Sequence, residues 1–213
     1  KMAGEEDPKV PGSLASKGIG TRLLILNAGS LMNLLLPLLL FSIAFMIPHN
    51  VVTGQVMIEE VDPDSPAARA GIEPGDTLLS VNEKPVNNTS DLHRYIQLNL
   101  GKEITILTKH SDSTTEDVQV IPRWKPPEGQ GAIGILVTTA NPTIVSQSEP
   151  FWRAIPSGVS ACMETFVLFK NEIIRMIIGS APVEIAGPVG IAQLTGEVVK
   201  AGISPLLEFA AFL

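Results

Sequence analysis

The sequence has a single cysteine, Cys162, among 213 residues, so no disulfide bond can form within the chain. It has only three histidines, His49, His93 and His110, which lie far apart and lack the His-Glu-x-x-His spacing of a zinc site. A nucleophilic serine would need a histidine and an aspartate within reach, and nothing in the spacing suggests such a set. We therefore expect neither catalytic residues nor metal ligands in this chain.

Charge is also scarce, and it is unevenly distributed. Charged residues make up 17% of the sequence, hydrophobic residues make up 45%, and the net charge is −7. Residues 48–150 include 14 acidic and 7 basic side chains, whereas the remainder of the chain is neutral. Binding to nucleic acid requires a basic surface that neutralises phosphates. The acidic middle of the chain therefore argues against nucleic acid as a partner.

Residues 23–47 contain no charged side chain at all. As a helix they would extend about 37 Å at about 1.5 Å per residue, enough to cross a hydrocarbon core of about 30 Å. A core helix of a soluble protein rarely lacks charge for so long, so we predict a transmembrane helix. Lys17 and Arg22 precede it, and no Lys or Arg follows until Arg69. The positive-inside tendency then places the loop 1–22 on the cytoplasmic side and the acidic domain outside.

Two asparagines and a proline interrupt the apolar character of this span. Asn27 and Asn33 carry polar groups that lipid cannot satisfy, and Pro37 frees one backbone carbonyl. One interpretation is ordinary hydrogen bonding to neighbouring helices. The other is that Asn33 lines a polar site within the membrane. The sequence leaves both open.

Residues 51–124 have the periodicity of a small module with the order β-α-β-α-β-β. In "DSPAARAG", Ser65 is a helix N-cap, Pro66 occupies the first helical position, and Gly71 ends the helix. A second, amphipathic helix is predicted in "TSDLHRYIQLN". Strands are predicted in "QVMIEEV", "TLLSVN", "EITILTKH" and "EDVQVIP".

This module contains one candidate binding site. Gly54 precedes a predicted strand and allows the backbone to turn sharply, so that successive N–H groups can hold the C-terminal carboxylate of an added peptide strand. Leu92 and Ile96 would form the opposite wall, unless they simply fill the core. The predicted peptide-binding residues are thus Gly54, Gln55, Val56, Met57, Ile58, Leu92 and Ile96.

The remaining polar candidates of the module are interpreted as structural. Asp76, in the turn "EPGD", is expected to satisfy backbone groups of that turn. His93 is predicted on the exposed side of its helix, and His110 next to a hairpin turn. Both are therefore interpreted as surface histidines without a paired carboxylate.

The C-terminal part of the sequence returns to apolar character. Residues 125–150 are predicted as a linker with one strand, "AIGILVT". Residues 151–180 carry apolar side chains at helical spacing together with four charges, which would be costly in lipid. We therefore favour an amphipathic helix on the membrane surface over a second full span. Residues 181–204 are predicted as a loop region, and residues 205–213 as the start of a truncated transmembrane helix. The apolar residues of the amphipathic segment are Phe151, Trp152, Ile155, Val159, Phe166, Phe169, Ile173 and Ile177.

Several segments together resemble a known family. "VDPDSPAARAGIEPGDTLLSVNEKPV" resembles the PDZ domains of bacterial membrane-linked proteases. With "KMAGEED", "TRLLILNAGSLMN" and "IAGPVGIAQ" in this order, essentially the whole chain resembles the site-2 protease family of intramembrane zinc metalloproteases. Ser30 departs from the proline that the family usually has in "AGP". The resemblance implies an α+β membrane protein in which a transmembrane helix precedes an extracytoplasmic PDZ-like β-sandwich or partly open barrel with two helices. An amphipathic helix and the start of another transmembrane helix follow.

The resemblance also implies a zinc site that lies elsewhere. The family's zinc is held by a His-Glu-x-x-His helix upstream and by an Asp of a downstream Leu-Asp-Gly motif, where the metal activates a water molecule. Neither motif is present in this sequence. We therefore interpret the chain as an internal fragment that binds no zinc and is inactive alone, although the full-length protein would hold Zn²⁺.

The resemblance implies a role in regulated intramembrane proteolysis in the bacterial inner membrane, as part of a multi-pass protein. The PDZ domain would filter or capture pre-cleaved single-pass membrane proteins or their cut C-termini. The alternative, from another class, is a membrane-tethered PDZ scaffold without protease activity. A trypsin-like periplasmic protease is disfavoured, because its catalytic domain would stand where this sequence has a membrane span.

Overall fold

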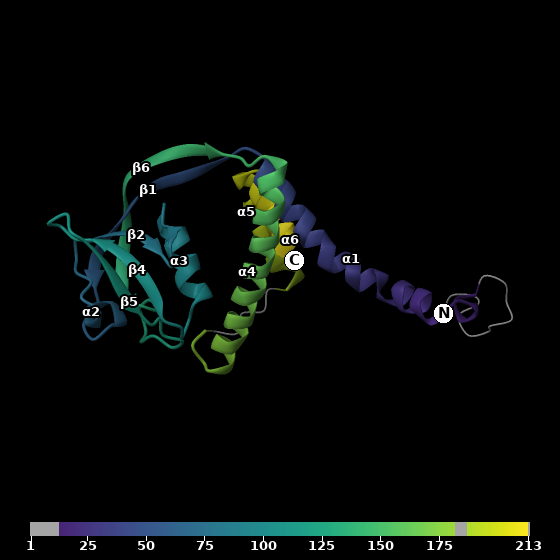
Figure 1. The fold of residues 1–213 in the computed structure, drawn as a ribbon, viewed down its shortest axis with the longest axis horizontal. Coiled ribbons are helices and arrows are strands. Elements are labelled where there is room, and N and C mark those ends of the chain that lie inside the picture. Colours follow the sequence, from purple (N-terminus) through teal and green to yellow (C-terminus); the bar gives the residue numbers. More distant parts are fainter. Residues whose placement is uncertain (1–12, 182–186, 213) are drawn as a thin grey trace.

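The computed structural model of the chain describes residues 13–181 and 187–212. A sheet domain stands beside a group of long helices, and a two-stranded ribbon joins them (Figure 1). The ribbon consists of β1, His49–Val61, and β6, Ile135–Gln147. The α+β class predicted from the sequence is confirmed.

The uncharged stretch forms α1, Ile19–Met46, which follows a short 3-10 turn, Leu14–Ser16. Gly18, in an extended conformation, is the N-cap, so the helix begins earlier than the predicted segment 23–47. Pro48 follows the end of α1, where a residue without a backbone N–H group cannot continue the helix. Within the described residues, α1 is the one helix that is long and apolar enough to cross a membrane.

The sheet domain contains a six-stranded antiparallel sheet in the order β5-β4-β2-β1-β6, with β3 paired to β2. Two helices complete the domain, as predicted. Besides β1 and β6, its elements are α2 (Pro66–Arg69), β2 (Thr77–Val81), β3 (Lys84–Pro85), α3 (Thr89–Leu98), β4 (Ile104–Lys109) and β5 (Thr115–Val120).

Both helices of the sheet domain begin with a side-chain cap. The hydroxyl oxygen of Ser65 accepts a hydrogen bond from the N–H of Ala68 at 3.0 Å, as the sequence predicts for an N-cap. Asn88 caps α3 in the same way, through the N–H of Asp91 at 2.8 Å. Gly71 follows α2 with φ +86°, a left-handed conformation that ends the helix at little cost for glycine.

β6 is longer than the strand that the sequence predicts within the linker 125–150. It extends to Gln147 and pairs with β1 along its whole length, with register shifts near Gly54 and Glu59. Thr, Val and Ile residues in "ILVTTANPTIVSQ" favour an extended strand despite Pro142. The linker is therefore partly an element of the sheet.

The core of the domain lies between the sheet and its helices. Ile133, which precedes β6, is only 1% exposed and belongs to this core although it lies outside the predicted module 51–124. Burial of such side chains contributes about 1.5–3 kcal/mol each. The other buried members are Val56, Ile58, Ala67, Ile72, Leu78, Val81, Val86, Leu92, Ile96, Ile104, Ile106, Val118 and Val120.

The helix α4, Phe151–Ile177, occupies most of the segment predicted as an amphipathic helix. Its large apolar side chains form an exposed stripe at helical spacing, while smaller residues face α1. The location of this stripe on a membrane surface stays a prediction. The stripe comprises Phe151, Trp152, Ile155, Val159, Met163, Phe166, Phe169, Ile173 and Ile177.

Two shorter helices follow, α5, Pro188–Ala201, and α6, Ile203–Phe212. The sequence predicts a loop over 181–204, so α5 is a difference. Pro188 in the first turn and Lys200 in the last favour a helix there, since a proline fits the first turn and a cation the C-terminal dipole. Residues 182–186 of that predicted loop, and residues 1–12 of the predicted N-terminal loop, lie outside the described residues.

The long helices pack through small side chains. Gly158 of α4 lies directly against Ser42 of α1, so the two backbones approach closely. The hydroxyl group of Ser204 in α6 donates to the carbonyl oxygen of Ala44 in α1 at 3.1 Å. Phe41, Ala161, Cys162 and Ala211 form a buried cluster between the three helices.

Candidate functional site

The segment Gly54–Ile58, predicted to receive a peptide as an edge strand, lies inside the sheet. Val56 and Met57 pair with β2 on one side and with β6 on the other. The N–H group of Gly54 donates to the carbonyl oxygen of Asn87 at 2.8 Å and is not free for a carboxylate. In this structure no peptide strand can add here, because both edges are occupied. This corrects the placement of the binding strand at Gly54, Gln55, Val56, Met57 and Ile58.

The edge of the sheet belongs to β6, which stands last in the strand order; none of the described strands pairs with its outer edge. Ile135 and Val137 of β6 and Leu92 and Ile96 of α3 line a common cavity of about 1000 Å³. Leu92 and Ile96 therefore line a cavity as predicted, although they are only 2% and 7% exposed and also belong to the core. The cavity has the size of a site for a small ligand or a short peptide end.

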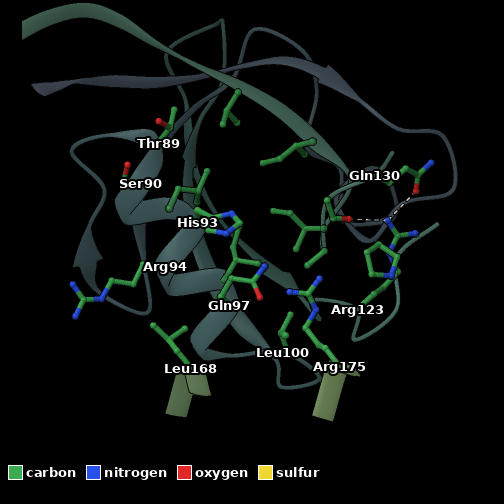
Figure 2. A pocket seen from close by; sticks show the side chains of 18 of the residues that line it. Thr89, Ser90, His93, Arg94, Gln97, Leu100, Arg123, Gln130, Leu168 and Arg175 are labelled. Atoms are coloured by element: carbon green, nitrogen blue, oxygen red, sulfur yellow. Dashed lines mark hydrogen bonds between the residues drawn. The ribbon is translucent and has the colours of Figure 1, made fainter. Parts of the chain in front are cut away.

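The long helices close the cavity on its remaining side. Thr165, Leu168 and Arg175 of α4 line it, as do Phe41 of α1 and Phe212 of α6. Figure 2 shows Leu168 and Arg175 projecting from α4 toward α3 and the sheet domain. A ligand in this cavity would therefore contact the sheet domain and the helices at once.

A polar loop forms one end of the cavity. Among the described residues, the N–H groups of Gly131, Ala132 and Ile133 have no hydrogen-bond acceptor. Arg123 lies beside this loop, where its Nη2 donates to Gln130 Oε1 at 3.0 Å and to the Gly131 carbonyl oxygen at 3.2 Å (Figure 2). Its Nε is buried without a partner in the described part of the chain. Successive N–H groups beside a guanidinium can hold an anion such as a carboxylate.

This end of the site is not among the residues predicted from the sequence, although the sequence contains a signal for it. The glycine before a strand that indicates a binding loop at Gly54 has counterparts in Gly131 and Gly134, which precede β6. Gly134 has φ +74°, where glycine is favoured. Gly54 instead lies at a register shift of β1, where an added Cβ would come within 2.6 Å of the Ala140 carbonyl oxygen.

We expect Gly134→Ala to lower the free energy of unfolding of the sheet domain by about 2 to 5 kcal/mol. The left-handed conformation costs about 1–2 kcal/mol, and the new Cβ would overlap with Ser65, the N-cap of α2, at a cost of about 1–3 kcal/mol. Urea unfolding followed by the fluorescence of Trp124, with Trp152→Phe, measures the change. Gly129→Ala is the matched control, because Gly129 has φ +81° and open space around its Cβ position. Equal losses in the two variants would contradict the overlap.

A second cluster of titratable groups lies in the sheet domain, away from the cavity. His110 Nδ1 lies 3.0 Å from Asp76 Oδ2, and its Nε2 lies 3.5 Å from Glu116 Oε2. The interpretation of His110 as a histidine without a carboxylate partner was therefore wrong. Asp76 also accepts a hydrogen bond from the N–H of Glu73 at 3.0 Å, as expected for its turn. The hydrogen bond to Asp76 raises the pKa of His110 above its ordinary value of 6.5.

This cluster predicts a pH-dependent stability of the sheet domain. The pKa of His110 is higher in the folded state than in the unfolded state, where it is about 6.5. Protonation of His110 therefore stabilises the fold fully when the pH is below the unfolded-state pKa. This stabilisation is lost as the pH rises through the folded-state pKa. His110→Gln should therefore destabilise the domain more at pH 5.5 than at pH 8.5 in urea unfolding. His93→Gln, an exposed residue of α3, is the control. A loss that is the same at both pH values would show that the ion pair is not the cause.

The asparagines of α1 are placed differently from one another. Asn27 Nδ2 donates to the carbonyl oxygen of Leu23 at 2.8 Å, so its amide is partly satisfied within its own helix. Asn33 lies on the exposed surface of α1, with no hydrogen bond to another described residue. Its role in a polar site within the membrane stays a prediction.

The sheet domain matches a known protein family. The family model of the PDZ domain matches residues 57–109. Among solved structures, the chain is similar to the PDZ domain of the SdrC-like protein from Listeria innocua, at 23% identity and a TM-score of 0.35, over 41% of this chain and 97% of that one. The predicted PDZ domain is confirmed by the family model.

The relatives extend the similarity to the whole chain. A protein of Clostridium acetobutylicum named "Putative zinc metalloprotease" is 30% identical over 100% of this chain and 60% of its own length. A Clostridium perfringens protein of the same name is 31% identical over 100% of this chain and 61% of its own. The "Regulator of sigma-W protease RasP" of Bacillus subtilis is 27% identical over 93% of this chain and 46% of its own length.

The chain thus contains a PDZ domain and is similar over its whole length to proteins named zinc metalloproteases. A RasP protein of Oceanobacillus iheyensis is also named a zinc metalloprotease, and the name of the Bacillus subtilis relative refers to the regulation of sigma-W. The chain spans about half to three fifths of the length of these curated relatives.

The zinc that the relatives' names imply does not fit the residues that the structure describes. In residues 13–181 and 187–212, no group of three or more His, Cys, Asp or Glu side chains could hold a metal ion. The His110 cluster offers one imidazole and two carboxylates, but the imidazole already bonds to both of them. No chemical step at a metal is therefore assigned to these residues.

Proposed function

We propose that this chain is part of an intramembrane zinc metalloendopeptidase and that its PDZ domain receives the cut C-terminus of a single-pass membrane protein. The observation that carries this proposal is the cavity between α3 and β6. It combines a free sheet edge, apolar walls from Leu92 and Ile96, and three N–H groups at one end. Strand addition with capture of a carboxylate is the recognition mode that such a groove supports.

Peptide binding to the whole chain in detergent micelles tests this role. A short labelled peptide with an apolar last residue and a free carboxylate should bind, and its C-terminal amide should bind more weakly. His93→Trp should weaken binding, because this exposed side chain of α3 lines the cavity. Thr115→Trp, on the exposed face of β5, should not. Absence of binding at millimolar concentration would exclude capture and leave a filter that acts by its bulk.

The alternative is a membrane-tethered PDZ scaffold without protease activity. The similarity of nearly the whole chain to proteins named zinc metalloproteases favours the enzyme. The gene sequence around the chain separates the two proposals. A His-Glu-x-x-His motif upstream and a Leu-Asp-Gly motif downstream support the protease, whereas their absence would leave the scaffold.

We place the PDZ domain outside the cytoplasm of a bacterial cell, with α1 as a membrane span. Lys17 and Arg22 flank the N-terminal side of α1, and the domain that follows is acidic. With Cys162 replaced by alanine and Ser111→Cys introduced in an exposed turn, an impermeant thiol reagent should label intact cells. Protection until the cells are lysed would reverse the orientation.

A further inference from the structure

The PDZ domain is held against α4 by a group of polar contacts. Glu164 of α4 makes two ion pairs, with Lys84 Nζ at 2.9 Å and with Arg94 Nη2 at 2.7 Å. About two turns further along α4, Asn171 Nδ2 donates to the carbonyl oxygen of Gln97 in α3 at 2.7 Å. Asn171 is 4% exposed, so this hydrogen bond satisfies an amide that would otherwise be buried without a partner.

The contact continues past the end of α4. The hydroxyl group of Ser180 donates to the carbonyl oxygen of Trp124 at 2.8 Å, next to Arg123 of the cavity. From Glu164 to Ile177, its last residue, α4 extends about 20 Å at about 1.5 Å per residue. α4 therefore lies along the open side of the groove and is fixed to the PDZ domain at both ends of that contact.

Between these two attachments, α4 places a cation in the cavity. Arg175 lines the same cavity as Arg123 and the loop Gly131–Ile133, and Figure 2 shows its side chain reaching from α4 toward Gln97. Its Nη1 pairs with Glu172 Oε2 at 3.0 Å. Arginine presents five N–H donors, so a single ion pair leaves others for a ligand. The guanidinium groups of Arg123 and Arg175 thus line the same cavity as the loop Gly131–Ile133, whose N–H groups have no acceptor among the described residues.

We infer that α4 is part of the binding site, an inference that rests on the proposed capture of a C-terminus. The carboxylate of the captured peptide lies between the loop Gly131–Ile133 and the guanidinium groups of Arg123 and Arg175. A carboxylate at this place offsets the repulsion between the two cations and accepts charge-assisted hydrogen bonds from both. Peptide binding and the docking of α4 onto the PDZ domain therefore stabilise each other.

This linkage has a consequence for the membrane helices. α4 is one continuous helix, and its N-terminal half packs against α1 through Gly158 and Ser42. A captured C-terminus that fixes Arg175 also fixes the helix that contacts α1. By thermodynamic reciprocity, a change in the α1–α4 contact alters the affinity of the groove.

Binding of the free-acid peptide and of its C-terminal amide to the whole chain tests the inference. Arg175→Gln should lower the affinity for the free acid about tenfold, which corresponds to about 1.4 kcal/mol, and should leave the affinity for the amide unchanged. Lys170→Gln is the matched control, because Lys170 is an exposed cation of the same helix that does not line the cavity. Arg175→Lys should retain part of the preference for the acid, since it keeps the charge and loses the planar fork.

A second measurement on the unaltered chain keeps the test independent of any folding defect. Hydrogen exchange of the α4 backbone should slow when the free-acid peptide is added and stay the same with the amide. Suppose the wild-type chain binds the free-acid peptide, but Arg175→Gln binds it equally well or hydrogen exchange in α4 does not slow. A binding site shared by α4 and the PDZ domain is then excluded, while capture by the PDZ domain alone stands. If the wild-type chain binds no peptide, capture itself fails and the inference fails with it.

Discussion

A chain limited to residues 51–123 is expected not to fold cooperatively, although its sequence has the pattern of a complete PDZ module. The structure places Ile133 in the core at 1% exposure, and Ile135 and Val137 pack against that core. Loss of one such buried isoleucine costs about 2–5 kcal/mol. The truncation also removes the only strand that covers the outer edge of β1 in the described structure. A domain of this size has about 5–15 kcal/mol of stability in total, so little would remain.

The matched comparison is a chain of residues 51–139, which restores Ile133 and the part of β6 that pairs with residues 56–61 of β1. Circular dichroism and urea unfolding should show a cooperative transition for residues 51–139 and none for residues 51–123. Cooperative unfolding of the shorter chain at similar urea concentration would mean that β6 contributes little, and would restore the boundary that the sequence suggests.

The boundary was missed because strand order is a long-range property. The local signals of the module were correct: Ser65 caps α2, Gly71 ends it, and "TLLSVN" forms β2 as the residue types predict. No local signal shows that Gln55 pairs with Ala140 rather than standing at a free edge. The predicted peptide site therefore relied on a strand, β1, that is not an edge, whereas the role of α3 in peptide binding stays a prediction.

The same limit applies to side-chain pairs. His110 and Asp76 lie 34 positions apart in the sequence and meet only because β4 pairs with β2, where Lys109 stands opposite Thr77. Arg123 and Arg175 likewise line one cavity only after α4 has docked on the PDZ domain. Spacing along the chain can predict caps, turns and helix faces, because these depend on near neighbours. It cannot predict which charged groups the folded chain brings together.

The largest effect expected among the helices is that of Gly158→Leu, which should separate α4 from α1. A Cβ at Gly158 would lie 2.8 Å from the backbone nitrogen of Ser42 and 3.0 Å from its Cα. These are backbone atoms of α1, which cannot rotate away as a flexible side chain could. Helices that meet at a glycine in this way depend on close approach of their backbones, and the overlap is expected to cost about 1–3 kcal/mol.

Cys162 reports this separation directly. It lies one turn beyond Gly158 on α4 and is 4% exposed. Because it is the one cysteine of the chain, the rate of thiol labelling measures access to this side chain. Because reaction requires access to the thiolate, Gly158→Leu should speed its alkylation about tenfold, as a loss of about 1.4 kcal/mol in the closed state implies. Gly196→Leu is the control, because nothing lies within 4 Å of its Cβ position on α5.

If α4 transmits binding to α1, Gly158→Leu should also weaken capture of the free-acid peptide. Unchanged labelling of Cys162 would show that α1 and α4 do not pack at Gly158, and the proposed coupling between the groove and α1 would then be excluded.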